Sequence, residues 1–351
     1  MKKIISILLV FIVFKTNAQT SDSTTNLTFS GYVEAYYNYD FNKPANHERA
    51  AFIYNHNRHN EFNINLAYLK ASYSQSKVRA NLSLMAGTYA NANLAAETGV
   101  LKNIYEANVG IKLGEKTWLD AGVLPSHIGF ESAVSKDCWN LTRGILAENS
   151  PYFESGARLT YAPNDKWTLV GLVLNGWQRI RRVDGNNTPA FGTQIVFKPN
   201  SKTTLNYSTF IGSDKPDTAR QMRIFHNLYG IFQVTDDFGL TVGFDIGTEQ
   251  KAKNSSEVNV WYAPILIGKY TINDKWAIAG RIENYTDEQG VIISNDFLTN
   301  GFSANLDFTP VSNAVFRIET RLLKAKNKIF TTEKGVSDQS FFITSSLAVS
   351  F

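Results

Sequence analysis

The chain has 351 residues, with 35 Lys and Arg against 31 Asp and Glu, which gives a formal net charge of +4. This near-neutral balance argues against nucleic-acid binding, which requires a basic patch or stripe. Cys138 is the only cysteine, so an internal disulfide is excluded and stability must come from the fold itself.

The first eighteen residues are predicted to be a signal peptide. Lys2 and Lys3 supply a basic start, residues 4–14 are apolar, and Thr16-Asn17-Ala18 fits a small-residue cleavage site. The apolar stretch is shorter than the ~20 residues of a membrane-spanning helix, which disfavours the alternative of a membrane anchor. We therefore expect an exported protein with a short N-terminal segment, residues 19–26, before a folded domain, residues 27–351.

Residues 27–41, LTFSGYVEAYYNYDF, alternate strictly between apolar and polar side chains. Leu27, Phe29 and Val33 share one parity, whereas Ser30 and Glu34 share the other. Period-two alternation predicts a β-strand, and this one is far longer than the usual strand of about five or six residues.

Patterns of the same kind predict about sixteen strands along the chain. In chain order they cover residues 27–41, 61–74, 77–91, 104–113, 117–124, 152–162, 166–178, 190–198, 202–212, 222–235, 238–248, 257–272, 275–286, 299–309, 313–324 and 339–351. Two are irregular. Residues 61–74 switch parity midway, which predicts a bulge, and residues 166–178 are apolar on both faces.

The connections between these strands alternate in length. Those after even-numbered strands are tight and rich in turn residues, as in the repeated phrase NDKW, whereas those after odd-numbered strands are long and polar. Short turns at one end and long loops at the other are typical of a transmembrane barrel with its turns in the periplasm. The predicted fold is therefore all-β, a transmembrane antiparallel up-and-down β-barrel of about 16 strands in one domain. An exported soluble β-sandwich that binds carbohydrate or a partner protein is the alternative.

Aromatic residues at the predicted strand ends fit the two membrane interfaces. Trp276 follows the turn NDK and shares the parity of Ile278 and Ile282. Phe341 and Phe351 share one face of the last predicted strand, and the stretch between them spans about 25 Å of membrane at a typical tilt. Because aromatic side chains favour membrane–water interfaces, we predict that Trp276, Phe341 and Phe351 form part of the lipid-facing girdles.

Segments in the first half of the chain carry a more specific pattern: FSGYVEAYYNYDFNKP, NEFNINLAYLKASY, LDAGVLPSHIGFES, DCWNLTRGILAENSPYFESGARLTY and LVLNGWQ. They resemble the putative beta-barrel porin-2 family, the OmpL-like porins of bacterial outer membranes, from about Ser30 to Trp177. The residues that carry the match are Gly122, Gly129, Glu131, Arg143, Pro151, Gly156 and Asn175-Gly176-Trp177. The resemblance implies a passive diffusion channel and supplies no catalytic residues. The terminal Phe351 resembles the signal by which outer-membrane proteins engage the barrel assembly machinery.

A barrel of this size has a lumen that side chains cannot fill. Sixteen strands give a backbone diameter of about 30 Å, which leaves an aqueous channel. The polar parity forms its wall, and the charged candidates there are Arg79, Lys112, Arg158, Arg281, Arg317, Arg321, Glu34, Glu106, Asp120, Asp245, Glu283, Asp307 and Glu319. Such charges set the ion selectivity of a pore. The alternative is that they only pair with one another and solvate the lumen.

The longest predicted connection, residues 125–150, is also markedly apolar. Phe130, Trp139 and Ile145 would be costly to expose to water, so we expect this loop to fold into the lumen and narrow it. Arg158, early in the strand that follows, is expected to lie close to the loop. Three acidic residues of the loop are expected to face the wall arginines across a constriction: Glu131, Asp137 and Glu148.

Histidines offer two weaker hypotheses of catalysis. Three of them share one predicted loop and are candidates for metal ligation, although that loop has no regular element to fix their geometry: His47, His56 and His59. His127 near Glu131 or Ser126 would suggest a hydrolytic site, but the sequence offers no partner pattern for it.

The sequence therefore predicts an outer-membrane porin without a cofactor, through which small hydrophilic solutes or ions diffuse. An outer-membrane barrel enzyme of hydrolase type stays the alternative from another class. The expected partners are the solutes, the lipid of the outer membrane and the barrel assembly machinery. A homotrimer and a monomer are both compatible with the pattern.

Overall fold

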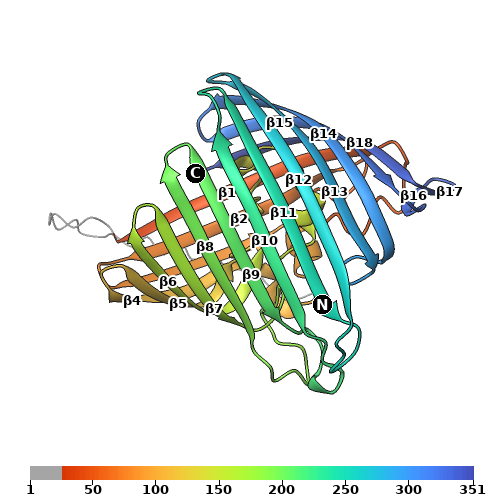
Figure 1. The fold of residues 1–351 in the computed structure, drawn as a ribbon. Helices are drawn as coiled ribbons and strands as arrows, with labels where there is room; N and C mark the ends of the chain where they lie inside the picture. The colour runs from red at the N-terminus through yellow and green to blue at the C-terminus, as the bar shows by residue number, and fades with distance from the viewer. Residues whose placement is uncertain (1–25) are drawn as a thin grey trace, which may run out of the picture.

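The computed structural model describes residues 26–351. The predicted signal peptide, residues 1–18, and residues 19–25 of the predicted N-terminal segment lie outside the described residues. Within the described part, sixteen strands form one closed barrel (Figure 1): β1 (Leu27–Asp40), β2 (Phe62–Ser74), β3 (Val78–Ala86), β4 (Ile104–Gly114), β5 (Thr117–Pro125), β6 (Phe153–Asn164), β7 (Trp167–Leu174), β8 (Ala190–Asn200), β9 (Thr203–Gly212), β10 (Arg223–Gln233), β11 (Phe238–Gln250), β12 (Val258–Asn273), β13 (Trp276–Gln289), β14 (Asn295–Val311), β15 (Ala314–Ala325) and β18 (Gln339–Ser350).

Every strand of the barrel is antiparallel to its neighbours, and β1 pairs with β18 to close the sheet. Closure satisfies the backbone N–H and C=O groups of all strands, which a lipid environment requires. The predicted up-and-down barrel is therefore confirmed. A small hairpin of β16 (Phe330–Thr332) and β17 (Gly335–Ser337) projects from the connection between β15 and β18.

The connections differ in length between the two ends of the barrel. One end has tight turns, such as residues 165–166 and 274–275, and the other has long loops, such as residues 41–61 and 126–152. The loops hold the short helices α1 (Thr88–Asn93) and α2 (Ile145–Glu148) and the 3₁₀ turns η1 (Gly99–Asn103), η2 (Ser135–Asp137) and η3 (Asp217–Ala219). None of the helices within residues 26–351 has the length and apolar character needed to cross a bilayer.

The repeated phrase NDKW forms the same turn twice. The side-chain oxygen of Asn164 accepts the backbone N–H groups of Lys166 (3.0 Å) and Trp167 (3.2 Å). In the second turn, the side-chain oxygen of Asn273 accepts the backbone N–H groups of Lys275 (2.9 Å) and Trp276 (3.1 Å). Asn thus closes the turn with its own side chain, so the next strand begins at the Trp.

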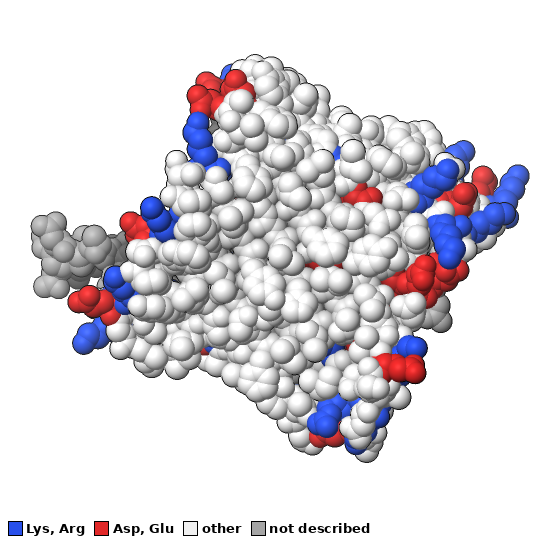
Figure 2. Space-filling view, in the orientation of Figure 1, with Lys and Arg blue, Asp and Glu red and all other residues white. Residues whose placement is uncertain are grey.

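On the face seen in Figure 2, charged residues lie mainly at the rims, and the exposed large side chains of the strands between the rims are apolar. Trp276, Phe341 and Phe351 are each partly exposed on the outer surface of the barrel. Trp276 packs against Phe308 of the neighbouring strand, with ring centroids 4.5 Å apart. This apolar band between the rims is the surface that a barrel presents to lipid, and aromatic side chains at its edges are typical of the interfaces.

The irregular patterns predicted for residues 61–74 (β2) and 166–178 (β7) have separate causes. The pairing of β1 with β2 shifts register so that Asn65 is an extra residue in β2, which is the predicted bulge. β7 is apolar on both faces because its lumen side is covered: Val170, Leu172 and Leu174 are buried in a cluster that includes Ile128 from the loop after β5. The lumen of this barrel therefore contains an apolar core as well as polar side chains.

Candidate pore constriction

Residues 126–152, which connect β5 to β6, turn into the barrel, and we call this segment the inner loop. It is the yellow segment behind the front wall in Figure 1. The backbone N–H of Gly129 donates to Asn227 on β10 (3.1 Å), and that of Leu141 donates to Asn305 on β14 (3.0 Å). Residues 140–151 are all buried. The inner loop therefore lies within the lumen, where its apolar residues led us to expect it.

Glycines on β11 make room for two aromatic side chains of the inner loop. Gly239 and Gly243 face the lumen, and a Cβ at these positions would lie 2.8 Å from Trp139 and 2.7 Å from Phe130, respectively. Contacts this short are not tolerated between carbon atoms, so a side chain at either position would force the neighbouring ring to move. The bare backbone of β11 is thus the surface on which the inner loop packs.

Arg317 on β15 binds the inner loop through its main chain. Its guanidinium makes a two-pronged pair with Asp307 (2.6 and 2.9 Å). The remaining N–H groups donate to backbone carbonyls of the loop at 2.5–3.3 Å, namely those of Ser135, Cys138, Trp139 and Asn140. A planar guanidinium with five donors is suited to this combination of carboxylate and carbonyl partners.

Arg281 and Arg321 form the second part of the same contact. Arg281 donates to the carbonyl oxygen of Thr142 (2.6 Å) and to Glu319 (2.9 Å), and Arg321 donates to the carbonyl oxygen of Arg143 (2.8 Å) and to Glu283 (2.5 Å). All three wall arginines are at most 1 % exposed. Charges so deeply buried are tolerated only when they are paired and hydrogen-bonded, as they are here.

The three predicted acidic residues of the inner loop take different positions. Glu131 is buried, accepts the N–H of Gly144 (2.7 Å) and lies 3.7 Å from Arg281, so it does meet a wall arginine. Asp137 is exposed and forms no ion pair among the described residues. Glu148 is buried, but its partners are the N–H groups of Tyr54 (3.0 Å) and Asn55 (3.2 Å) in the loop after β1. The geometry thus brings one of the three acids to an arginine.

Glu148 also has an unusual protonation equilibrium. Burial raises the pKa of its carboxyl to about 7, although hydrogen bonds from Asn55 and the Tyr54 main chain favour the ionised form. This carboxyl joins the inner loop to the loop after β1. Its protonation therefore changes the hydrogen bonds that hold the two loops together.

The opposite wall, formed by β2 to β6, is covered where Ala133 and Val134 of the inner loop pack in a buried cluster with Leu66 and Val123, but several of its charged side chains stay partly exposed. Lys70 pairs with Glu106 (2.5 Å), and Asp120 accepts Arg79 (2.6 Å) with Arg158 at 3.6 Å. Arg158 therefore pairs within the wall rather than with an acid of the inner loop. The basic side chains are 24–32 % exposed, whereas the two carboxylates beneath them are at most 7 % exposed. Lys112, on the same face, is exposed as well. The charge that this wall presents to water is therefore positive.

The histidines do not converge on a common site. His56 lies 3.2 Å from Glu34, His59 accepts the N–H of Asp40 (2.9 Å), and His47 bonds the carbonyl oxygen of His59 (3.0 Å). His127 pairs with Glu154 (2.8 Å), not with Glu131 or Ser126. Among residues 26–351 no group of three His, Cys, Asp or Glu side chains is arranged to hold a metal ion.

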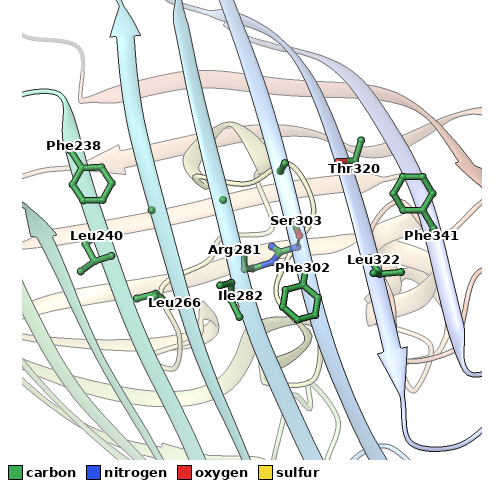
Figure 3. Close-up of a pocket in the computed structure, with 13 residues that line it drawn as sticks. Phe238, Leu240, Leu266, Arg281, Ile282, Phe302, Ser303, Thr320, Leu322 and Phe341 are labelled. Atoms are coloured by element: carbon green, nitrogen blue, oxygen red, sulfur yellow. Dashed lines mark hydrogen bonds between the residues drawn. The ribbon is translucent and has the colours of Figure 1, made fainter.

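A separate groove of about 630 Å³ lies on the outer surface between β11 and β18 (Figure 3). Its lining is mostly apolar and includes Phe302, Leu322 and the predicted girdle residue Phe341. The guanidinium of Arg281 is buried on the lumen side, where it donates to Ser303 (2.9 Å). The groove therefore faces lipid and is not part of a solute path.

A closed barrel of sixteen antiparallel strands, an apolar outer band and a loop folded into the lumen define a channel of the outer-membrane porin class. The chain belongs to the family of putative beta-barrel porin-2, OmpL-like, whose model matches residues 26–351. It is thus a porin of the bacterial outer membrane. No curated protein sequence matches the chain.

Solved outer-membrane proteins share this fold. An anion-selective porin from Comamonas acidovorans has 9% identity and a TM-score of 0.62, and the match covers 93% of this chain and 99% of that one. The channel DcaP of Acinetobacter baumannii has 12% identity and a TM-score of 0.60, with 93% and 97% covered. OmpT of Vibrio cholerae, for which a trimer form has been solved, has 10% identity and a TM-score of 0.59, with 93% and 99% covered.

Sequence reasoning gave Arg143 no role beyond the family match, although it is central to the inner loop. Its guanidinium donates to the carbonyl oxygens of Leu141 (2.6 Å), Ala133 (2.9 Å) and Ser132, which ties the two halves of the loop together. The signal available was an arginine in the middle of an apolar loop, a position where a charge needs many partners.

Proposed function

We propose that this porin is a non-enzymatic channel for small hydrophilic solutes and ions, and that among ions it prefers anions. The path follows the wall formed by β2 to β6, because the inner loop covers the wall formed by β11 to β15. The observation that carries the preference is the exposure of Lys70, Arg79 and Arg158 above carboxylates that are themselves buried. A pore lined by exposed positive charge concentrates anions near its axis.

Reconstitution of the barrel in planar bilayers tests this proposal. We expect discrete conductance steps. In a KCl gradient, we expect the reversal potential to be displaced from zero towards the equilibrium potential of chloride. Lys112→Glu reverses an exposed charge that forms no ion pair among the described residues, so it should move selectivity towards cations. Lys166→Glu, in a periplasmic turn, is the matched control and should change little. If the reversal potential of the unchanged protein were displaced towards the equilibrium potential of potassium, the anion preference would be overturned.

Three further parts of the proposal concern export and assembly. Residues 1–18 act as the signal peptide, β18 is the strand recognised by the barrel assembly machinery, and the protein is a homotrimer, by analogy with the trimer form of OmpT. N-terminal sequencing of the purified protein should begin at Gln19. Chemical cross-linking in intact outer membranes should give a trimer band, and a monomer alone would contradict that part.

A further inference from the structure

A cavity of about 280 Å³ lies at the mouth of the barrel, at the end with the long loops. It is bounded by five connections that are distant in the sequence and by the ends of the inner loop and of β10. Its lining includes Tyr54, Asn93, Trp177, Arg179, Asp214 and Arg223. On the topology of a porin this end faces the outside of the cell, so an entering solute meets this open cavity before it reaches the lumen.

One side of the cavity is a fixed aromatic surface. The ring of Trp177 meets Phe210 and Phe225 edge to face, with centroid distances of 5.0 and 4.9 Å, and this packing holds its plane. The backbone N–H of Trp177 donates to Asp214 (2.9 Å), which fixes the loop that carries it. Val291 and Ile292 line another part of the cavity, and their N–H groups are bound by Asp287 at 2.8 and 2.7 Å.

The lining also contains planar polar groups. The side-chain oxygen of Asn93 is buried and has no hydrogen-bond partner within residues 26–351. Gln178 has a left-handed backbone (φ 53°) and spans the site, accepting the N–H of Tyr152 (2.7 Å) and donating to the carbonyl oxygen of Asn93 (3.4 Å). A buried acceptor without a partner is costly, and a ligand that donates a hydrogen bond would satisfy it.

The charges around the cavity balance. Arg179 lies 3.8 Å from Asp214, and Arg223 has Glu249 as its partner, so each guanidinium of the lining is matched by a carboxylate. Arg223 is paired with Glu249 (2.7 Å) and lies over the Trp177 ring, with 5.2 Å to its centroid. A balanced lining favours a neutral polar ligand over an ion. The volume lies just below the range of about 300–1,000 Å³ for drug-sized ligands, so it fits one ring.

We propose that this cavity binds one pyranose ring of a neutral saccharide before the sugar enters the pore. An apolar ring face packs against Trp177, whereas hydroxyl groups donate to Asn93 and accept from Arg179. The inference rests on the proposed function, since the site matters for transport only if the barrel conducts. It names a substrate class that the porin fold alone does not give.

Binding is measured apart from conduction, by calorimetry on the folded barrel in detergent with glucose and maltose as probes and glucuronate as the charged comparison. We expect saturable binding of the neutral sugars, weaker binding of glucuronate, and about tenfold weaker binding of maltose in Trp177→Ala and in Asn93→Ala. Trp118→Ala, on the lumen face near the opposite end, is the control and should bind as the unchanged chain does.

The outcomes separate the two proposals. No binding at about 100 mM sugar, or equal binding in the Trp177→Ala, Asn93→Ala and Trp118→Ala variants, overturns the saccharide site even if the barrel conducts. Tighter binding of glucuronate than of glucose overturns the neutral class. Sugar binding by a barrel that gives no conductance overturns the channel instead. Heat-modifiable migration in electrophoresis checks that each variant is folded, and Arg179→Gln replaces Trp177→Ala if that variant does not fold.

Discussion

Arg317 and Asp307 face each other across β15 and β14, and the guanidinium binds both carboxylate oxygens while its other N–H groups bind the main chain of the inner loop. The pair therefore joins the barrel wall to the loop that narrows its lumen. Breaking a buried pair by removing one partner leaves the other charge uncompensated.

Arg317→Gln should destabilise the barrel by about 3–5 kcal/mol, measured as the free energy of unfolding in urea with tryptophan fluorescence. Lys326→Gln is the matched control, because Lys326 forms an exposed pair with Asp296 (2.8 Å). Exposed pairs contribute about 1 kcal/mol or less, so this change should be small. Equal losses in the two variants would show that the buried pair does not secure the loop.

Gly243→Val should displace Phe130 and loosen the inner loop, because there is no space for a side chain at this position. Overpacking of this kind costs about 1–3 kcal/mol in stability. Open-channel noise in planar bilayers should increase as well. Gly280→Val is the control: Gly280 is on the outer face of β13, where a Cβ would lie 3.7 Å from the carbonyl oxygen of Ser303, an ordinary van der Waals contact. Unaltered noise and stability in Gly243→Val would contradict the packing of the loop on β11.

Deletion of residues 130–146 should raise single-channel conductance while the barrel stays folded, because the segment that fills the lumen is removed. The guanidinium groups of Arg281, Arg317 and Arg321 would then face water together with their carboxylate partners Glu319, Asp307 and Glu283, so the ion selectivity should change little. Conductance and reversal potential are measured in the same bilayer. An unchanged conductance would mean that the loop does not limit the flow.

Leu82→Arg and Asn81→Arg test which side of the wall faces lipid. Leu82 is exposed on the outer face of β3, and Asn81 points into the lumen, where it donates to Asn108 (3.1 Å). An arginine on the lipid face should cost about 2–4 kcal/mol near the membrane midplane, whereas the lumen variant should fold normally. The yield of the heat-modifiable folded band reports both, and equal loss would refute the assignment of faces.

Glu148→Gln should remove a pH dependence of stability. In the folded chain Glu148 holds its proton up to about pH 7, whereas in the unfolded chain a carboxyl releases it near the ordinary value of 4.5. The folded state binds the extra proton between these values, so stability falls as pH rises through this window and is constant above it. The total change is at most about 3 kcal/mol. Thermal melts from pH 5 to 8 should flatten in Glu148→Gln but not in the exposed control Glu333→Gln.

The barrel could be predicted from the sequence because its signal is local. The alternation in residues 27–41 and the Asn-closed turn before Trp276 depend only on neighbouring residues, and both recur in the structure. The parity switch that predicted a bulge is equally local, and the structure places the extra residue at Asn65. A strand buried on both faces, such as β7, was ambiguous because its second apolar face is explained by a distant loop.

The partners inside the lumen could not be predicted in the same way. Glu148 was expected to meet an arginine, but it binds the main chain of Tyr54 and Asn55, which lie about ninety positions earlier in the chain. Arg158 was expected near the inner loop, and it does lie close enough to His127 to act on its charge, but its acidic partner is Asp120 on the adjacent strand. Which acid meets which base depends on how the loop docks, and parity fixes only the face on which each side chain lies.

The contacts of the inner loop also fix an order of events in assembly. Arg317 and Ser135 are 182 positions apart, and Gly129 and Asn227 are 98 positions apart. The loop is therefore made long before the strands that hold it, and it has no docking surface until those strands have paired. Contacts of such long range are slow to form. We therefore expect newly inserted barrels to conduct at first with an undocked loop and to become narrower as the loop docks.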